Sequence, residues 1–241
     1  MLILSVDSSA SPASVCLSED GKIIADYYLN TGFTHSQTLM AMVESALKIS
    51  GVSVNDIDLF AVNNGPGSFT GVRIGVSAVK GMAYAADKPC VGVSTLESMA
   101  YNFLGNHAAV CACMDARRSQ VYNALFGVEG KEIARLYDDE AVSIDDLLIR
   151  IGLNLGETIL VGDGAELVYE KTKNNKTGSF ENIVLAPEHL RYQRASSTAA
   201  AALEKYKRGE IVSPAALMPT YLRLSQAERE RNAKLNQTTN D

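Results

Sequence analysis

The opening of the chain combines short apolar runs with one amphipathic segment. Apolar runs at 2–6, 14–17 and 22–29, separated by polar turns, predict three strands of an antiparallel meander. From His35 the period changes, because apolar residues recur at the i, i+3, i+4 and i+7 spacing of a helix with one apolar stripe. Gly51 follows this stripe, so we expect the helix to end there.

A glycine-rich loop then separates a strand from a second helix. We expect a buried strand over 58–63, the loop over 65–71 and the helix over 72–86. Small residues recur along this helix, and they let a neighbouring helix come close. A strand over 89–93 and a helix over 96–104 complete the first half.

The second half repeats the first. Residues 128–137 align with 19–28 and share Gly, Lys, Ile, Ala and Tyr with them, and Asp115 aligns with Asp7 at almost the same offset. Residues 160–164 repeat the junction of the strand and the glycine loop. These matches occur in the same order, which indicates an ancient duplication. Each half therefore predicts an α/β lobe with a mixed sheet flanked by helices.

The predicted organisation is two lobes and a tail. The first lobe spans 1–104 and the second spans 108–225, with a polar boundary at 105–107. An alanine-rich helix over 195–208 lies in the second lobe by sequence and can pack back on the first. Residues 226–241 are polar and charged, and we expect them to form a frayed tail.

Composition and charge narrow the function classes. The 241 residues are 46% hydrophobic and 21% charged, which is typical of a globular protein with a sizeable core. With 22 basic and 28 acidic residues the net charge is −6, and this balance disfavours tight nucleic-acid binding by the chain alone. Apolar runs are far shorter than the roughly 18 residues of a membrane span, and no export signal is recognisable. We therefore expect a cytoplasmic protein without a membrane partner.

Two features resemble parts of a phosphate site. Asp7, Ser8 and Ser9 follow the first strand, and Gly65 and Gly67 begin the loop before the second helix. Together they are a candidate remnant of a nucleotide or phosphate site, since free amides and a helix N-terminus attract anions. For the Asp7 turn we favour a structural role, because such residues often only satisfy turn backbone. For the loop, anion binding and close packing of elements remain equally supported.

Other catalytic patterns are missing from the sequence. His35, His107 and His189 are far apart and none has a metal ligand at i+4. The chain has no nucleophile elbow, P-loop ending or common dinucleotide fingerprint. The four cysteines, for which we expect buried and reduced thiols, are Cys16, Cys90, Cys111 and Cys113. We predict no catalytic residue, no metal site and no cofactor.

A series of motifs runs along the chain, namely DSS at 7–9, HSQTL at 35–39, GPGSFTGVRIG at 65–75, MDARR at 114–118 and PTYLR at 219–223. In sequence and order they resemble the bacterial TsaB (YeaZ) family, from Met1 to about Arg223. The resemblance implies two similar lobes of the actin-like, Hsp70-like and sugar-kinase-like (ASKHA) fold. It also implies a role in forming threonylcarbamoyladenosine beside the tRNA anticodon.

The resemblance further implies a protein that is not itself an enzyme. The related TsaD subunit transfers the threonylcarbamoyl group and holds a metal with a His-x-x-x-His pair. Alignment places Thr95 and Met99 at the two histidines and keeps Glu97 between them. Neither Thr nor Met is a good ligand for a hard metal ion. We therefore expect a non-catalytic partner of TsaD, in an assembly that the ATPase TsaE joins, with tRNA contacted only through that complex.

The first two helices form the expected docking face for TsaD, or for a second copy of this chain when TsaD is lacking. The residues of this expected face are His35, Leu39, Met42, Val43, Val72, Gly75, Val76, Ala78, Val79 and Met82. A stable contact of this kind buries on the order of 1,600 Å². The alternative is that the second helix is simply core.

Two further function classes compete with the scaffold role. An ATP-dependent small-molecule kinase of the same fold would hold phosphates with Asp7 and the glycine loops. Tight binding of ATP and Mg²⁺ by the isolated chain would distinguish it. A peptidase is the least favoured class, because the sequence offers neither a metal pair nor a nucleophile with a base.

Overall fold

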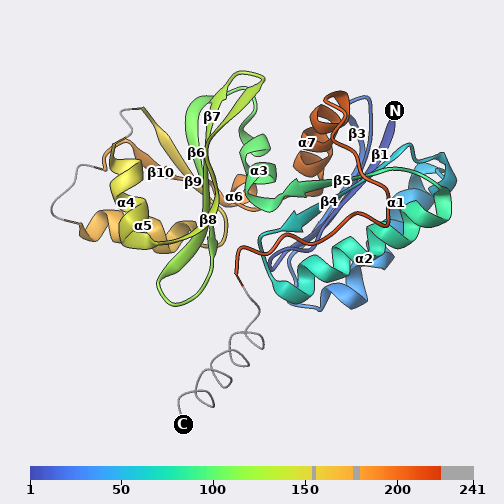
Figure 1. The fold of residues 1–241 in the computed structure, drawn as a ribbon, viewed down its shortest axis with the longest axis horizontal. Helices are drawn as coiled ribbons and strands as arrows, with labels where there is room; N and C mark the ends of the chain where they lie inside the picture. Colours follow the sequence, from blue (N-terminus) through green and yellow to red (C-terminus); the bar gives the residue numbers. More distant parts are fainter. Residues whose placement is uncertain (154–155, 176–179, 224–241) are drawn as a thin grey trace, which may run out of the picture.

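Two five-stranded sheets organise the chain, and they stand side by side in Figure 1. The computed structural model describes residues 1–153, 156–175 and 180–223, so the tail expected at 226–241 lies outside the described residues. The strands of the first sheet are β1 (Leu2–Asp7), β2 (Ala13–Glu19), β3 (Lys22–Leu29), β4 (Leu59–Gly65) and β5 (Cys90–Ser94). Those of the second are β6 (His107–Asp115), β7 (Gln120–Glu129), β8 (Glu132–Ser143), β9 (Thr158–Val161) and β10 (Ile183–Leu185).

Both sheets have the same topology. The strand order is β3-β2-β1-β4-β5 in one and β8-β7-β6-β9-β10 in the other. In each, three strands form an antiparallel meander and two later strands join in parallel. The expected α/β fold of two similar halves is confirmed, and β1 and β6 end at equivalent places.

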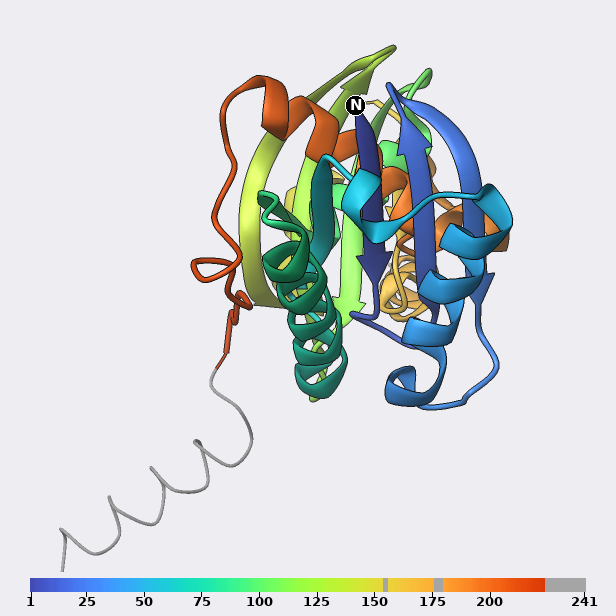
Figure 2. The same ribbon diagram turned by 90° about the vertical axis from the view of Figure 1, so that its right-hand side faces the viewer.

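Helices cover both faces of each sheet. They are α1 (His35–Ser50), α2 (Phe69–Ala86), α3 (Thr95–Ala100), α4 (Ile144–Gly152), α5 (Ala165–Asn174), α6 (Glu188–Arg191) and α7 (Ala195–Lys207), with 3-10 turns at Val54–Asp56 and Tyr101–Phe103. Helices α1 and α2 pack on one face of the first sheet, as Figure 2 shows, and α7 packs on the other. Helix α3 covers the inner face of the second sheet, while α4 and α5 cover its outer face. No helix in the described part of the chain has the length and apolar character needed to cross a membrane.

Local sequence explains where the first two helices begin and end. Helix α1 starts at His35 as expected, and Gly51 takes a left-handed conformation with φ 66° at its C-terminus, where its N–H bonds the Leu47 and Lys48 carbonyls. Helix α2 starts at Phe69, earlier than the expected residue 72, because the Ser68 hydroxyl caps its first turn. The helix expected at 96–104 is shorter, since its end tightens into a 3-10 turn. All four cysteines are buried, as expected.

Candidate functional site

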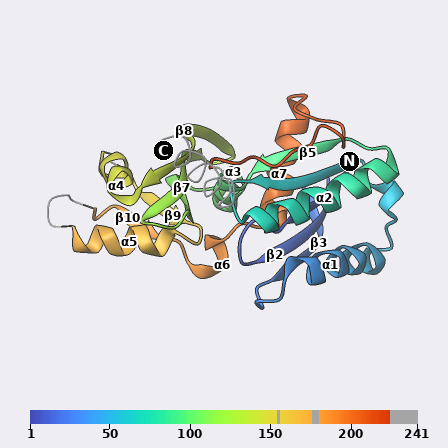
Figure 3. The ribbon, with the colours of Figure 1, turned by 60° about the horizontal axis from the view of Figure 1, so that its bottom comes forward.

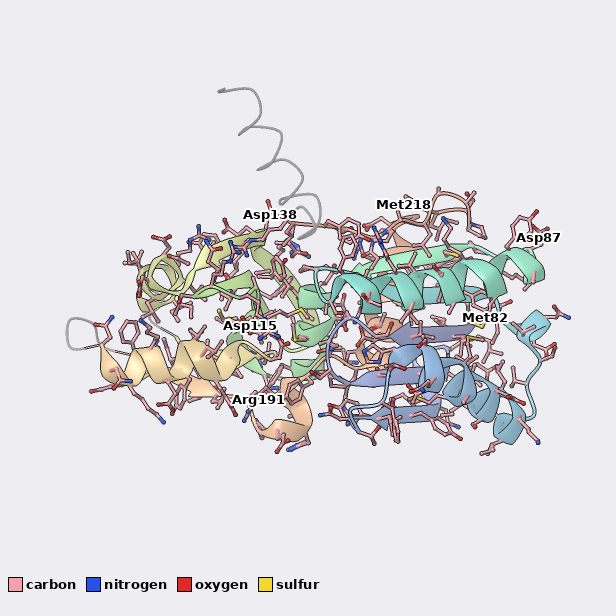
Figure 4. The ribbon with its side chains drawn as sticks, turned by 90° about the horizontal axis from the view of Figure 1, so that it is seen from below. Met82, Asp87, Asp115, Asp138, Arg191 and Met218 are labelled. Atoms are coloured by element: carbon pink, nitrogen blue, oxygen red, sulfur yellow. The ribbon has the colours of Figure 1, made fainter. Side chains whose placement is uncertain are left out.

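A cleft opens between the two halves where β1 and β6 end. Its volume is about 580 Å³. Figure 4 places Asp115, the last residue of β6, in the middle of the molecule between the two halves. The cleft is lined by residues that follow β1, by the glycine loop, by the Asp115 turn and by residues 220–223. The two turns that the sequence alignment equates therefore meet at one place.

The Asp7 carboxyl group is sealed from this cleft, although the residues that follow it line the cleft. The Asp7 carboxyl group is fully buried, and its Oδ1 accepts hydrogen bonds from the Ser9 amide at 3.2 Å, the Ser9 hydroxyl at 2.6 Å and the Asn63 side chain at 3.0 Å. Its Oδ2 has no hydrogen-bond partner among the described residues. Burial raises the pKa of Asp7, and these donors, with the nearby Gln193 amide, offset only part of the effect. A carboxyl group placed in this way has no face open to a hydrated metal ion.

The glycines of the loop make room for packing. A side-chain carbon at Gly67 would lie 2.3 Å from the Ser9 carbonyl oxygen, and one at Gly71 would lie 2.1 Å from the Ser8 carbonyl oxygen. The Ser68 amide donates to the Ser9 carbonyl at 2.6 Å. Amides that would attract an anion are thus used within the protein. The geometry favours close packing over the remnant of a phosphate site.

The equivalent turn of the second half remains open. Asp115 keeps 23% of its side chain exposed, accepts the Arg117 amide at 2.7 Å and pairs with the Arg117 guanidinium at 3.1 Å. Arg117, Arg118 and Ser119 have φ angles of 64°, 57° and 57°. Left-handed backbone costs non-glycine residues roughly 1–2 kcal/mol each, so this turn is strained. It carries two exposed arginines, of which Arg117 lines the cleft.

A C-terminal segment, residues 212–223, forms one side of the cleft, and we call it the strap. Sequence patterns assigned it no role beyond the PTYLR motif. The strap begins beside β5, where Val212 bridges Cys90, and Lys80 of α2 donates to the Leu217 carbonyl at 2.9 Å. The Thr220 carbonyl oxygen lies so close to Gly65 that a side-chain carbon there would approach it to 2.3 Å. The absence of a side chain at Gly65 therefore allows the strap to pack closely against this residue.

The end of the strap brings aromatic and cationic groups to the cleft. Tyr221 stacks on Phe69 with ring centroids 4.6 Å apart, and the Arg73 Nε donates to the Tyr221 hydroxyl at 2.7 Å. Arg223 crosses to the second half, where it donates to the Ala116 carbonyl at 2.9 Å and lies over the Tyr122 ring. The strap thus links the two halves over the cleft.

Helix α3, where the resemblance places the lost histidines, is a packing element. Thr95 and Met99 are fully buried, and the Glu97 carboxylate pairs with Arg135 at 3.4 Å. Within the described ranges, no three His, Cys, Asp or Glu side chains converge on one point. The donor set at α3 does not fit a metal of the kind that two histidines would hold.

The expected docking face needs correction. The residues of that face that are buried in the core of the first half are Leu39, Met42, Val43, Val72, Gly75, Val76 and Val79. An apolar stripe on each helix faces the sheet of its own half, so a partner has no access to these side chains. His35, Ala78 and Met82 are half-buried, and the His35 Nε2 donates to the Ala10 carbonyl at 2.7 Å.

The outer surfaces of α1 and α2 carry other apolar side chains. The two helices run next to one another on the same side of the first sheet in Figure 3. Met40 on α1 is 48% exposed and Tyr84 on α2 is 80% exposed. These side chains, with Ile49 near the end of α1 and the half-buried Ala78 and Met82, are apolar groups on the surfaces of the two helices.

Comparison with known proteins gives matches along nearly the whole chain. The family model described as "TsaD: tRNA N6-adenosine threonylcarbamoyltransferase" matches residues 30–230. The tRNA threonylcarbamoyladenosine biosynthesis protein TsaB of Escherichia coli (strain K12) is 32% identical over 237 residues, which cover 97% of this chain and 100% of that protein. TsaB of Bacillus subtilis (strain 168) is 31% identical over 95% of this chain and 96% of its own length. The solved structure of YeaZ from Pseudomonas aeruginosa superposes with a TM-score of 0.79 over 92% of this chain and 99% of that one, at 25% identity.

Proposed function

The chain belongs to the TsaB (YeaZ) family of tRNA threonylcarbamoyladenosine biosynthesis proteins, and from this we propose that it is the non-catalytic partner of a TsaD-type transferase. In this proposal the transferase carries the threonylcarbamoyl group to the adenosine beside the anticodon. A TsaE-type ATPase joins the assembly, and tRNA binds through the complex in the cytoplasm. Without the transferase the chain pairs with a second copy of itself.

One observation carries the proposal that the chain does not catalyse the transfer. The side chains at the positions that the resemblance equates with the metal-holding histidines are Thr95 and Met99, and both are enclosed in the core. Glu97, the neighbouring carboxylate, is already neutralised by Arg135. A transfer that needs a charged metal at this helix would have to find its ligands on another chain.

The geometry of the Asp7 turn argues against the kinase alternative. A kinase of this fold needs an accessible carboxylate and free backbone donors for the phosphates and their cation. Asp7 is instead fully buried, and the Ser68 amide is bonded to the Ser9 carbonyl. We therefore expect calorimetry of the isolated chain with ATP and Mg²⁺ to give no tight binding.

We propose that the transferase docks on the exposed surfaces of α1 and α2, and not on the buried stripes of these helices. Exposed apolar side chains on α1 and α2, with small residues between them, suit a helix face of the related transferase. Gly75 is a poor position to test this contact, because a side-chain carbon there would lie 2.7 Å from the Ser8 hydroxyl oxygen and disturb the core. Met40 is the better position, since it is 48% exposed.

The test is co-purification with the transferase homologue, followed by a tRNA modification assay with and without this chain. We expect modification only when both are present. Met40→Glu should weaken co-purification at least about tenfold, because it places a charge at an apolar contact. Ile149→Glu is the matched control, since Ile149 is 68% exposed on α4 at the far side of the second half (Figure 1). Full modification without this chain, or equal loss with both variants, would contradict the proposal.

A further inference from the structure

We propose that the mouth of the cleft binds single-stranded RNA, with arginines on the phosphates and Tyr221 against a base. This inference rests on the proposed function, because a partner of a tRNA-modifying enzyme meets an RNA whose anticodon loop is unpaired. It assigns the chain its own contacts to the RNA within the assembly. The residues that carry it come from the Asp115 turn and from the strap.

The cleft and its immediate neighbours carry more arginines than carboxylates, whereas the whole chain is acidic. Arg117 and Arg223 line the cleft together with the carboxylates of Asp115 and Asp163. Arg73 lies against two lining rings, Phe69 and Tyr221, and Arg118 follows Arg117 in the chain. The chain as a whole has 22 basic and 28 acidic residues. A local excess of positive charge within an acidic protein attracts phosphate groups to this site and leaves the rest of the surface repulsive to them.

Two of the arginines are free to exchange partners. The Arg117 side chain is 86% exposed, and its ion pair with Asp115 is of the surface kind that contributes about 0–1 kcal/mol. Arg118 makes no ion pair within the described ranges and is exposed. Arg117 lines the cleft, and Arg118 is the next, exposed residue of the same left-handed turn, so phosphates can reach this turn without the unfolding of any element.

An aromatic surface lies across the cleft from this turn. Tyr221 is 42% exposed, lines the cleft and rests on Phe69, which fixes its ring in place. Arg73 lies 3.8 Å from the Phe69 centroid and holds the Tyr221 hydroxyl. A fixed aromatic ring beside guanidinium groups is the arrangement on which unpaired bases stack, and each stacked base contributes about 1–3 kcal/mol.

The same cleft is poorly suited to a mononucleotide triphosphate. Such a ligand needs donors and a cation deep in the cleft, where Asp7 is sealed and the glycine loop is filled by the Ser8 and Ser9 carbonyls. The positive groups lie instead at the rim and on both halves. A volume of about 580 Å³ accepts a base and sugar, while the backbone of a longer strand can follow the arginines outside.

The test measures RNA affinity of this chain assembled with its transferase partner, by anisotropy of a labelled anticodon stem-loop at several salt concentrations. The double variant Arg117→Glu with Arg118→Glu should lower the affinity at least about tenfold and reduce the salt slope by about 1.4, which corresponds to two phosphates. Tyr221→Ala should also lower it about tenfold, whereas Tyr221→Phe keeps the ring and should retain it. Lys131→Glu is the control for charge, because Lys131 lies beyond the far end of the ten-residue strand β7.

Affinities within about twofold of wild type for both the arginine and the Tyr221→Ala variants would overturn the inference. Binding of ATP with Mg²⁺ that these variants abolish, with RNA affinity unchanged, would overturn it in favour of a mononucleotide site. A paired duplex of the same length should bind more weakly than the stem-loop, and equal binding would also overturn it. Co-purification is recorded on the same samples, so normal pairing with unchanged RNA affinity contradicts this inference alone, and failed pairing contradicts the proposed function.

Discussion

The turn after β1 and the turn after β6 occupy equivalent positions in the two halves, yet the first is enclosed and the second faces solvent. Asp7 is fully buried, whereas Asp115 keeps 23% of its side chain exposed. Both strands end in a carboxylate, and both turns are followed along the chain by an antiparallel partner strand. The difference therefore arises from what covers each turn.

Contacts from other elements enclose the first turn. The His35 ring donates to the Ala10 carbonyl at 2.7 Å, and the Ser68 amide donates to the Ser9 carbonyl at 2.6 Å. Over the second turn, the strap supplies a hydrogen bond from Arg223 to the Ala116 carbonyl. The two equivalent halves thus have one strand end that acts as core and one that remains available as a surface. The variants below are chosen to remove or strengthen this difference.

Gly71→Ala should have the largest effect. A side-chain carbon at Gly71 would lie 2.1 Å from the Ser8 carbonyl oxygen, so α2 must move away from the sealed turn. We expect the free energy of unfolding to fall by about 3 kcal/mol, measured by urea denaturation. Gly81 lies on the same helix, and a side-chain carbon there would have no atom within 4 Å. Gly81→Ala should therefore raise the free energy of unfolding by up to about 1 kcal/mol. Equal effects of the two variants would show that the first turn is not held by close packing.

Asp7→Asn should stabilise the protein at neutral pH. Burial raises the pKa of Asp7 in the folded state, so wild-type stability falls as pH rises through the ordinary Asp pKa of about 3.9 and then through the raised value. Asn has no proton to lose, and its neutral amide faces the nearby Gln193 side chain without the cost of burying a charge. We expect a gain of about 2 kcal/mol at pH 7 that disappears below about pH 4.

The control for this prediction is Asp115→Asn. That change removes the ion pair with the exposed Arg117 guanidinium and keeps an oxygen that can accept the Arg117 amide. It should alter the free energy of unfolding by less than about 1 kcal/mol at neutral pH. Chemical denaturation of both variants at several pH values makes the comparison. A loss of stability in Asp7→Asn at pH 7 would mean that the buried carboxylate is used in its charged form.

The sequence predicts elements that depend on nearby residues. The apolar spacing after His35 and the glycine at 51 define α1 within the chain itself, and the structure begins and ends the helix there. The repeated motifs likewise predict two similar sheets, because strand order follows from the order of strands and connections. Local signals of this kind do not require knowledge of distant contacts.

Other features depend on contacts between distant residues. An apolar stripe shows that a face is buried, but it does not show what buries it. The prediction that Leu39 and Val79 contact a partner is therefore wrong, because both pack in the core of their own half. The strap brings Tyr221 to Phe69, about 150 residues away along the chain, and no periodicity reports such a meeting. The sequence does not predict the left-handed turn at Arg117 either, because arginine has no preference for a positive φ angle.

Arg223→Ala should produce an intermediate effect by loosening the open turn. The Arg223 guanidinium bonds the Ala116 carbonyl and lies over Tyr122, which links the strap to the second half. Loss of one hydrogen bond and one cation–π contact should lower the free energy of unfolding by about 1–2 kcal/mol. Arg117→Ala serves as the control, since its 86% exposed side chain should contribute less than about 1 kcal/mol. Equal small effects would show that the strap does not hold the two halves together.

Arg118→Gly should give the smallest change, and its sign is informative. Arg118 has a φ of 57°, where glycine is relaxed and a side chain is strained by roughly 1–2 kcal/mol. Glycine also gains entropy in the unfolded chain, which offsets about 0.5–1 kcal/mol of that relief, so a net stabilisation of about 0.5 kcal/mol is expected. Arg118→Ala removes the same charge and keeps the strained backbone, so it should show no gain. Stability that rises equally in both variants would assign the effect to repulsion among the arginines, and the open turn would then be strained by charge and not by its backbone.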